Sequence, residues 1–154
     1  MVTIPATCKT PGEKRLQCTD LCKGYLSDPV TLPIDADHHA PYAIRTSYDP
    51  RYERYAFRCA GCLTLFSMQY GVPRTDVYVG ANAEGAVTIT DMATLTDSQF
   101  GALGTAELPF ANFADAMNYA AVAAKQHGNA TVHILDDAYV PSNYDTPTFT
   151  GTVT

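Results

Sequence analysis

The sequence predicts a mainly β protein with one well-defined α-helix. Its 154 residues correspond to a single domain or to two small ones, and 46% of them are hydrophobic. This content is sufficient for a core and excludes a disordered or collagen-like chain. Ten prolines, ten glycines and ten tyrosines, with no tryptophan, are typical of short strands joined by turns. Long helical periodicity occurs in one segment only, which disfavours a helical bundle.

Charge and composition change near Val72 and Pro73, and this change predicts two modules. Residues 1–75 contain nine Lys and Arg against seven Asp and Glu, a net charge of +2. Residues 76–154 contain one against nine, a net charge of −8. All five cysteines precede the change, and the alanine-rich segment follows it. We therefore expect a small Cys-rich β module over residues 1–72 and a second module over residues 73–154.

The chain's overall acidity argues against nucleic acid as a partner. The net charge is −6, and no basic run is longer than Lys14-Arg15. Membrane insertion is not expected, because no apolar stretch approaches the roughly 18 residues that a spanning helix needs. The first 15 residues also lack the pattern of a signal peptide. We expect either an intracellular protein or part of a longer exported chain whose signal lies elsewhere.

Prolines divide the first module into short extended pieces, which we predict as strands at 15–18, 30–34 and 52–59. The module has too few large apolar side chains for a core of its own, so a cross-link is expected. In the second module, residues 76–79 and 86–90 are predicted to form a hairpin around a Gly-rich turn. Further strands are predicted at 130–135, 138–140 and 146–154, and a short helix at 96–103.

The clearest local prediction is a helix from Phe113 to His127. Asn112 is suited to the N-cap, Asp115 falls in the first turn, and Gly128 follows the last turn. Apolar residues recur at spacings of three and four and predict one narrow buried stripe, which a sheet is expected to cover. The stripe consists of Phe113, Met117, Ala120, Ala121 and Ala124.

The cysteine spacing favours a structural zinc site. A C-x3-C pair, Cys18 and Cys22, is separated by 36 intervening residues from a C-x2-C pair, Cys59 and Cys62, and Cys8 precedes both. Short spacings let a turn direct two thiolates at one tetrahedral ion. Disulfides are the alternative in an extracellular protein, but five cysteines would leave one thiol unpaired. Zinc is therefore the predicted cofactor.

Two ligand sets are compatible with this pattern. The favoured set contains the four paired cysteines Cys18, Cys22, Cys59 and Cys62. In the alternative set Cys8, Cys18 and Cys22 are joined by His38 or His39, which lie between the two pairs. Either histidine is equally consistent with a solvated loop residue.

Residues 3–22, TIPATCKTPGEKRLQCTDLC, followed by VTLP at 30–33 and by His38, resemble a small Cys/His repeat of large surface proteins of Gram-positive bacteria. Such zinc-ribbon-like repeats contain a Thr-Cys, a Gly-Glu turn, a C-x2-C pair and a segment ending in Gly-His. This chain has one more residue within the pair and lacks the glycine before His38. The resemblance covers about the first 40 residues and implies a metal-stabilised module of a surface protein.

The second module is similar to the opening of right-handed parallel β-helices of the pectate-lyase-like class. The similarity rests on DVYVG at 76–80, GTAELPFANFADAM at 104–117 and ATVHIL at 130–135. It implies a helix that caps the stack, followed by the first solenoid coil. Since a solenoid needs about three coils, we expect either part of a longer solenoid or a strand edge completed by another subunit.

No catalytic role is expected. The phosphate-loop, zincin and esterase motifs are absent, and a tight turn explains the adjacent Asp136 and Asp137. His127 and His133 are interpreted as a helix-end cation and a strand surface residue.

The predicted function is a noncatalytic structural or binding module of a cell-surface or secreted protein, acting in adhesion, glycan contact or spacing. The alternatives are the N-terminal part of a polysaccharide-active β-helix enzyme and a self-assembling virion or filament subunit. The predicted partners are a glycan or protein ligand and a second copy bound through the C-terminal strand edge. The predicted location is extracellular or at the cell surface, with virion or cytoplasm as the alternative. Five tyrosines are predicted to provide exposed contact surface: Tyr42, Tyr48, Tyr52, Tyr55 and Tyr70.

Overall fold

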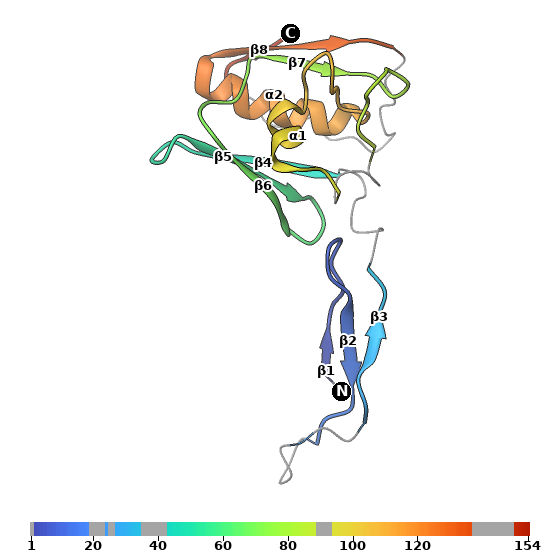
Figure 1. Ribbon diagram of the computed structural model, residues 1–154. Coiled ribbons are helices and arrows are strands. Elements are labelled where there is room, and N and C mark those ends of the chain that lie inside the picture. Colours follow the sequence, from blue (N-terminus) through green and yellow to red (C-terminus); the bar gives the residue numbers. More distant parts are fainter. Residues whose placement is uncertain (1, 19–23, 25–26, 35–42, 89–93, 137–149) are drawn as a thin grey trace.

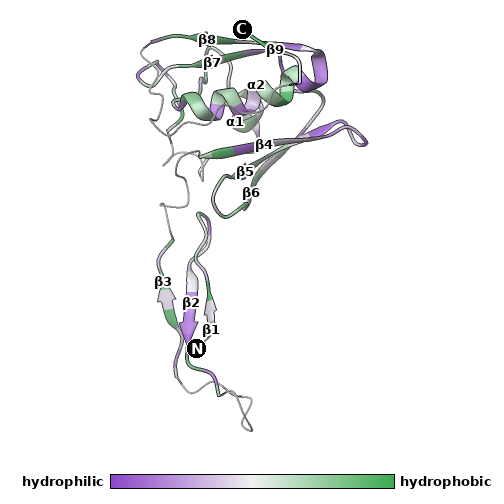
Figure 2. Cartoon of the chain, turned by 180° about the vertical axis from the view of Figure 1, so that it is seen from behind, coloured by the Kyte–Doolittle hydropathy of each residue, from purple (hydrophilic) through white to green (hydrophobic). Residues whose placement is uncertain are grey.

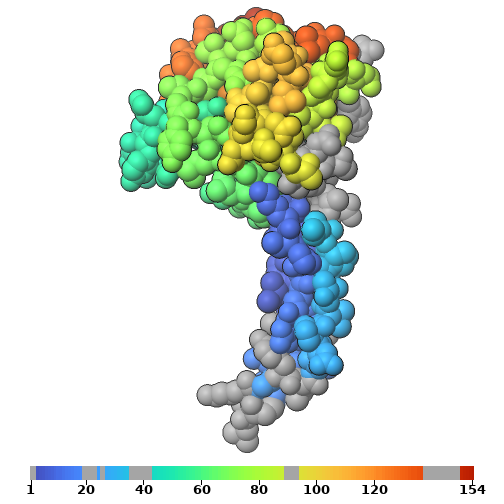
Figure 3. Space-filling model, in the orientation of Figure 1, coloured from blue at the N-terminus to red at the C-terminus, as the bar shows by residue number. Residues whose placement is uncertain are grey.

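The protein is mainly β in the computed structural model. The structure describes residues 2–18, 24, 27–34, 43–88, 94–136 and 150–154. In these ranges it contains two helices and three three-stranded sheets (Figure 1). The N-terminal sheet forms a narrow arm, and the other two sheets form a broader body with the helices (Figure 3). The predicted mainly β class is confirmed at this level.

The arm is an antiparallel sheet with little buried surface of its own. Its strands, in spatial order, are β1 (Val2–Ile4), β2 (Gly12–Arg15) and β3 (Val30–Leu32). Ile4 is 56% exposed and Val30 61% exposed, so apolar burial within the arm is slight. Gly12 is required by packing, because a Cβ there would lie 2.4 Å from the backbone nitrogen of Ala6. The arm therefore depends on the body for its position.

The second sheet is an antiparallel meander whose inner face joins the core. Its strands are β4 (Ile44–Asp49), β5 (Arg54–Cys59) and β6 (Leu65–Tyr70), in that spatial order. Alternation along the strands directs Ile44, Tyr55 and Phe57 inward, where each is at most 7% exposed. Arg45 and Ser47 occupy the intervening positions and are exposed. One face of this sheet is thus apolar and buried, and the other is polar.

The third sheet is parallel. It consists of β7 (Asp76–Val79), β8 (Asn129–Ile134) and β9 (Thr152–Val153), in that spatial order. Each strand is added beside the one that precedes it in the chain. On the other side of β7, Phe110 forms parallel bridges with both Val79 and Val87. The described ladder therefore extends from Val87 through Phe110 to β9.

This arrangement shows that the predicted hairpin of residues 76–79 with 86–90 is wrong in its pairing. Val79 and Val87 do not pair with each other, because both pair with Phe110 between them. Residues 89 and 90 lie outside the described part of the chain. A local turn pattern indicates that the chain reverses but does not identify the neighbouring strand. Phe110 is completely buried, so placing it between the two segments gains apolar burial that a direct hairpin would lack.

Both predicted helices are confirmed. α1 spans Asp97–Ala102, and Thr96 and Gln99 form a capping box at its start. α2 spans Phe113–His127, and the Asn112 side chain accepts a hydrogen bond of 2.8 Å from the Ala114 backbone N–H. Gly128 ends α2 in the left-handed conformation, with φ of 86°. Capping residues thus determine where both helices begin and where α2 ends.

The single buried stripe predicted for α2 is wrong, because the helix is covered on two sides. It lies between β4 of the meander and the parallel sheet (Figure 1). Figure 2 shows hydrophobic colour over much of α2 and hydrophilic colour at its C-terminal end. Met117 and Ala121 are only half-buried. The buried residues are Ala114, Asp115, Ala116, Tyr119, Ala120, Ala123 and Ala124.

Tyr119 lies at the centre of the core. Its ring stacks on Phe57 with centroids 6.0 Å apart, and Phe110 lies 5.9 Å away on the side of the parallel sheet. The Tyr119 hydroxyl accepts a hydrogen bond of 3.2 Å from the backbone N–H of Arg74. One continuous core therefore crosses the predicted boundary between residues 72 and 73. The division into two modules stays a prediction.

Asp115 is a buried carboxyl group that joins α2 to the start of β4. Its Oδ1 accepts hydrogen bonds of 3.0 Å from the backbone N–H groups of Ala43 and Ile44. Its Oδ2 is buried with no hydrogen-bond partner among the described residues. Burial raises the pKa of Asp115 to about 7, although the two hydrogen bonds partly oppose this shift.

We predict that Asp115 makes the protein less stable as the pH rises. Because its pKa is about 7 in the folded state and 3.8 ordinarily, the folded state binds the proton more tightly. Its contribution is fully present below pH 3.8 and is lost as the pH rises through about 7. The loss is on the order of 4 kcal/mol. Denaturant titrations from pH 4 to 8 should show this slope in the wild type and not in Asp115→Asn, which retains the Oδ1 acceptor. Equal slopes in the two proteins would contradict the prediction.

Candidate metal centre

Three cysteine sulfurs meet where the arm joins the body. Cys8 belongs to the turn between β1 and β2, Cys59 is the last residue of β5, and Cys62 lies in the turn between β5 and β6. Their Sγ atoms all lie within 4.8 Å of one another, and those of Cys8 and Cys62 are 3.6 Å apart. All three are reduced thiols. The two halves of the group come from segments about 50 residues apart in the sequence, and they are close enough to hold a metal ion.

The turn after β5 directs two of the sulfurs to the same side. The Cys59 N–H donates to the Thr64 carbonyl at 2.9 Å, and the Leu63 N–H donates to the Cys59 carbonyl at 3.0 Å. These bonds close a tight loop around Cys62. Leu63 has a φ of 60°, which is unusual for a residue with a branched side chain. Gly61 precedes Cys62 and adds no side chain to this narrow turn.

The third sulfur is held by a separate turn in the arm. The Thr7 hydroxyl accepts hydrogen bonds from the backbone N–H groups of Lys9 and Thr10, at 3.2 and 2.9 Å. The Lys9 ammonium group donates to the carbonyls of Leu65 and Phe66 on β6, at 3.2 and 3.4 Å. It also lies 5.3 Å from the centroid of the Phe66 ring. Lys9 therefore fixes the Cys8 turn against the body.

The environment gives the thiols of Cys8 and Cys62 different acidities. Cys8 and Cys59 are buried, whereas Cys62 is half-buried. Burial, followed by hydrogen bonds to the other two thiols, raises the pKa of Cys8 to about 12. Burial also opposes ionisation of Cys62, but hydrogen bonds from Thr64 and Cys8 outweigh it and lower the pKa of Cys62 to about 6. The Thr64 hydroxyl lies 3.0 Å from the Cys62 sulfur. Cys62 thus ionises more readily than Cys8.

The structure brings together only part of each predicted ligand set. Cys59 and Cys62 of the favoured set are joined by Cys8 of the alternative set. Cys18 follows β2, at the end of that strand opposite to the Cys8 turn, and it is disulfide-bonded. Cys22, His38 and His39 lie outside the described residues. Cys8 was a predicted ligand only together with Cys18 and Cys22, because spacing does not show which loop of the arm contacts the body.

The segment between His39 and Ala43 is short enough for a histidine to remain a possible ligand of the thiol group. The carbonyl of Ala43 accepts a hydrogen bond of 3.3 Å from the N–H of Ala60, which directly follows Cys59. His39 precedes Ala43 by four residues, and four residues span at most about 14 Å. A histidine therefore stays a candidate for the fourth position of the site.

A separate cavity of about 590 Å³ opens beside β7 and contains no cysteine. Asp76 and Tyr78 line it, and both contact His133. The His133 Nε2 is 2.8 Å from Asp76 Oδ1, and its ring stacks on Tyr78 at 4.5 Å. His127, at the end of α2, places Nε2 2.7 Å from the Pro73 carbonyl. The positions at the end of α2 and on strand β8 are those expected for the two histidines.

The predicted tyrosine surface is correct only in part. Tyr52 is 60% exposed and Tyr70 is 79% exposed, as expected for contact residues. Tyr48 is half-buried against the core. Tyr55 is 7% exposed and packs against Tyr119, so its predicted exposure is wrong. Strand alternation places it on the inner face of β5, and Tyr42 lies outside the described residues.

Comparisons with known proteins identify no relative. A scan against protein-family models and searches of curated proteins and solved structures found no match to this chain. None of the helices in the described ranges is long and apolar enough to cross a membrane.

We predict that Thr64 sets the acidity of Cys62. In chelator-treated protein, Cys62 alkylation followed by peptide mass spectrometry should show a pH midpoint near 6. Thr64→Val should move this midpoint upward and slow alkylation at pH 7 by about tenfold, because the hydroxyl no longer stabilises the thiolate. Thr64→Ser retains the hydroxyl and should keep the low midpoint. An unchanged midpoint in Thr64→Val would show that Thr64 has no such role.

Proposed function

We propose that this chain is a noncatalytic structural module in which a zinc ion bound by Cys8, Cys59 and Cys62 fixes the arm to the body. The observation that carries the proposal is the convergence of three sulfurs from two distant segments within 4.8 Å. Tetrahedral Zn–S bonds of 2.3 Å place two sulfurs about 3.8 Å apart. The 3.6 Å between Cys8 and Cys62 is near this value and far from the roughly 2.05 Å of a disulfide.

Electrostatics supports an ion at this position. Once one thiol of the group has ionised, its negative charge opposes ionisation of the neighbouring thiols. A divalent cation that binds the thiolates removes this repulsion. The arm has little core of its own, so a bond through metal would supply the stability that apolar burial does not. The fourth ligand stays a prediction, with His38, His39 and Cys22 as candidates, because Cys18 is disulfide-bonded.

The module is proposed to belong to a cell-surface or secreted protein. The resemblance of residues 3–22 to surface-protein repeats supports this, as does the elongated arm, whose form suits spacing or adhesion. We further propose that the parallel sheet begins a right-handed β-helix. The successive addition of β7, β8 and β9, with α2 packed against all three, supports this proposal.

The zinc proposal predicts one zinc ion per chain. Metal analysis of protein purified without chelator should give this ratio, and Cys8→Ser, Cys59→Ser and Cys62→Ser should each lower it at least tenfold. Ser98→Ala, an exposed change in α1, is the control and should retain the metal. His38→Ala, His39→Ala and Cys22→Ser identify the fourth ligand. Absence of zinc together with a disulfide between Cys8 and Cys62 would refute the proposal.

A second proposed function, self-association, is favoured by the edge of the parallel sheet. The Thr152 N–H donates to the carbonyl of Gly128, just before β8, at 3.0 Å, and the Thr154 N–H donates to the carbonyl of Ala130 in β8, at 2.9 Å. The backbone groups of Val153 therefore point to the outer side of β9, where the described residues provide no neighbouring strand. An open edge of this kind pairs with another strand, and a second copy would supply one.

We predict that Val153→Pro weakens self-association without unfolding the sheet. Proline removes only the outward N–H, so the bonds from β9 to β8 remain. Light scattering during size-exclusion chromatography should show a concentration-dependent mass for the wild type and a monomer for the variant. Val153→Thr is the matched control and should behave as the wild type. A wild type that stays monomeric up to millimolar concentration would argue against this function.

A further inference from the structure

The polar face of the meander places two arginines directly opposite each other. In the antiparallel register of β4 and β5, Arg45 pairs with Arg58. Cβ atoms at such positions are about 4.5–5.5 Å apart, and like charges placed there destabilise a sheet. Arg45 is exposed and Arg58 half-buried, so both guanidinium groups belong to the outer surface. The fold therefore maintains a local charge repulsion on a chain whose net charge is −6.

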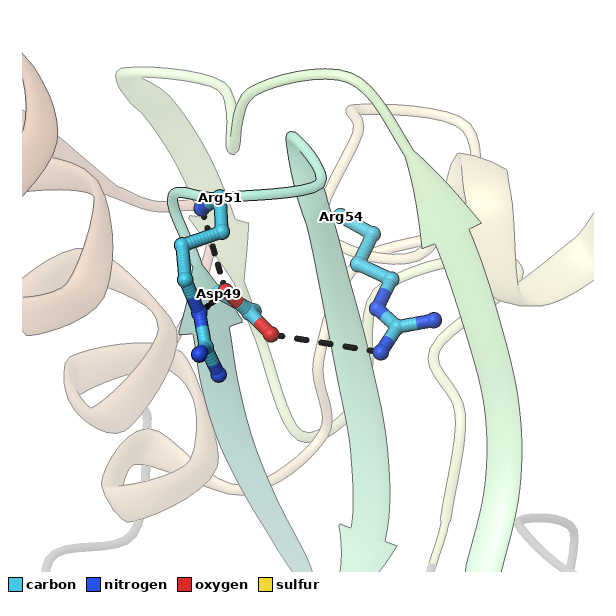
Figure 4. Close-up of polar contacts among 3 residues, drawn as sticks. All are labelled: Asp49, Arg51 and Arg54. Carbon is cyan, nitrogen blue, oxygen red and sulfur yellow. Dashed lines mark hydrogen bonds and ion pairs between the residues drawn. The ribbon is translucent and has the colours of Figure 1, made fainter.

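Nearby carboxylates do not relieve this repulsion. Among the described residues, neither Arg45 nor Arg58 has a carboxylate oxygen within 4.0 Å. The opposite end of the same hairpin differs (Figure 4). There Asp49 lies between two arginines, with Oδ1 3.5 Å from Arg51 and Oδ2 3.9 Å from Arg54. The sheet thus neutralises one arginine pair with its own carboxylate and leaves the other without one.

The two guanidinium groups lie at a defined cavity. It has a volume of about 320 Å³ and is lined by Arg45, Ser47, Arg58 and Leu63. This volume is at the lower end of the range for small-molecule sites. Ser47 adds a hydroxyl group two residues along β4 from Arg45, on the same face. The lining is consequently rich in hydrogen-bond donors.

One of the arginines is held in place. Arg58 Nη1 donates a hydrogen bond of 3.2 Å to the Leu63 carbonyl. Leu63 adopts the left-handed conformation, with φ of 60°, and its exposed side chain lines the cavity. Backbone strain of this kind costs free energy and concentrates at binding sites. Here the strained turn orients the Arg58 guanidinium group and leaves its other N–H groups available to a ligand.

We propose that this cavity binds an oxyanion group, a carboxylate, sulfate or phosphate, between Arg45 and Arg58. Guanidinium groups bind such groups with paired, charge-assisted hydrogen bonds, and a bound anion converts the repulsion between the two arginines into attraction. The Ser47 hydroxyl supplies a further donor. The cavity has room for the part of a larger ligand that bears the oxyanion. This site uses no cysteine and does not depend on the proposed metal.

The test measures anion binding to the purified full chain. Phosphate, sulfate and acetate are each titrated against chloride at constant ionic strength, with the arginine Nε–Hε NMR signals and the melting temperature as readouts. At least one of the three anions should raise the melting temperature. The same anion should shift the Arg45 and Arg58 signals along a curve that saturates. Preference for acetate indicates a carboxylate ligand, and preference for phosphate or sulfate indicates a tetrahedral one.

Variants distinguish a specific anion site from a general effect of salt. Arg45→Gln should weaken binding at least tenfold, and in chloride it should melt no lower than the wild type because the like-charge pair is gone. Arg51→Gln, at the exposed arginine beside Asp49, is the control and should bind as the wild type does. The proposal is overturned if none of the anions differs from chloride, or if Arg45→Gln and the wild type respond equally. Zinc content is measured in the same samples, so that absence of anion binding is distinguished from absence of the metal site.

Discussion

The contact between the Cys8 turn and the end of β5 determines how the two parts of the described chain are held together. The arm buries little apolar surface, so its position depends on a small number of specific contacts. These contacts are the approach of Cys8 to Cys59 and Cys62 and the bonds from Lys9 to β6. An amino group and three sulfurs thus lie where larger domains place a hydrophobic interface. A cross-link at this point would hold the arm in one orientation.

The body is organised differently, around a helix buried on two sides. Alanine is frequent in α2 because a helix between two sheets must approach both closely, and larger side chains would separate the layers. Tyr119 is the exception, since its ring fills the space next to Phe57 and its hydroxyl reaches the backbone of Arg74. Asp115 is a further polar group buried in the body. Its two hydrogen bonds to β4 fix the position of the helix start relative to the meander.

Local signals in the sequence predicted local structure well. The ends of α2 follow from Asn112 and Gly128, because capping depends on residues that are neighbours in the chain. Predictions that depended on distant neighbours were less successful. The turn after β7 was identified, but Phe110 takes the position expected for the returning strand. The stripe on α2 was too narrow, because periodicity does not show that a second sheet covers the helix.

The same limit applies to the cysteines. The C-x2-C spacing of Cys59 and Cys62 predicted correctly that their sulfurs converge, because a single turn controls both. Cys8 arrives from another sheet, and its approach depends on how the arm docks. No residue pattern within the arm encodes that docking, although Lys9 beside Cys8 is the residue that secures it.

Strand β5 shows how these features fit together in six residues. Its inner positions place Tyr55 and Phe57 in the core and end at Cys59 in the thiol group, whereas its outer positions carry Arg54 and Arg58. Because side chains alternate with a period of two, one strand supplies an apolar core, a sulfur ligand and a basic surface without conflict. The turn that follows serves both faces, since Cys62 belongs to the thiol group and Leu63 orients Arg58. The two sides of this turn thus belong to separate candidate sites, the thiol group and the arginine pair.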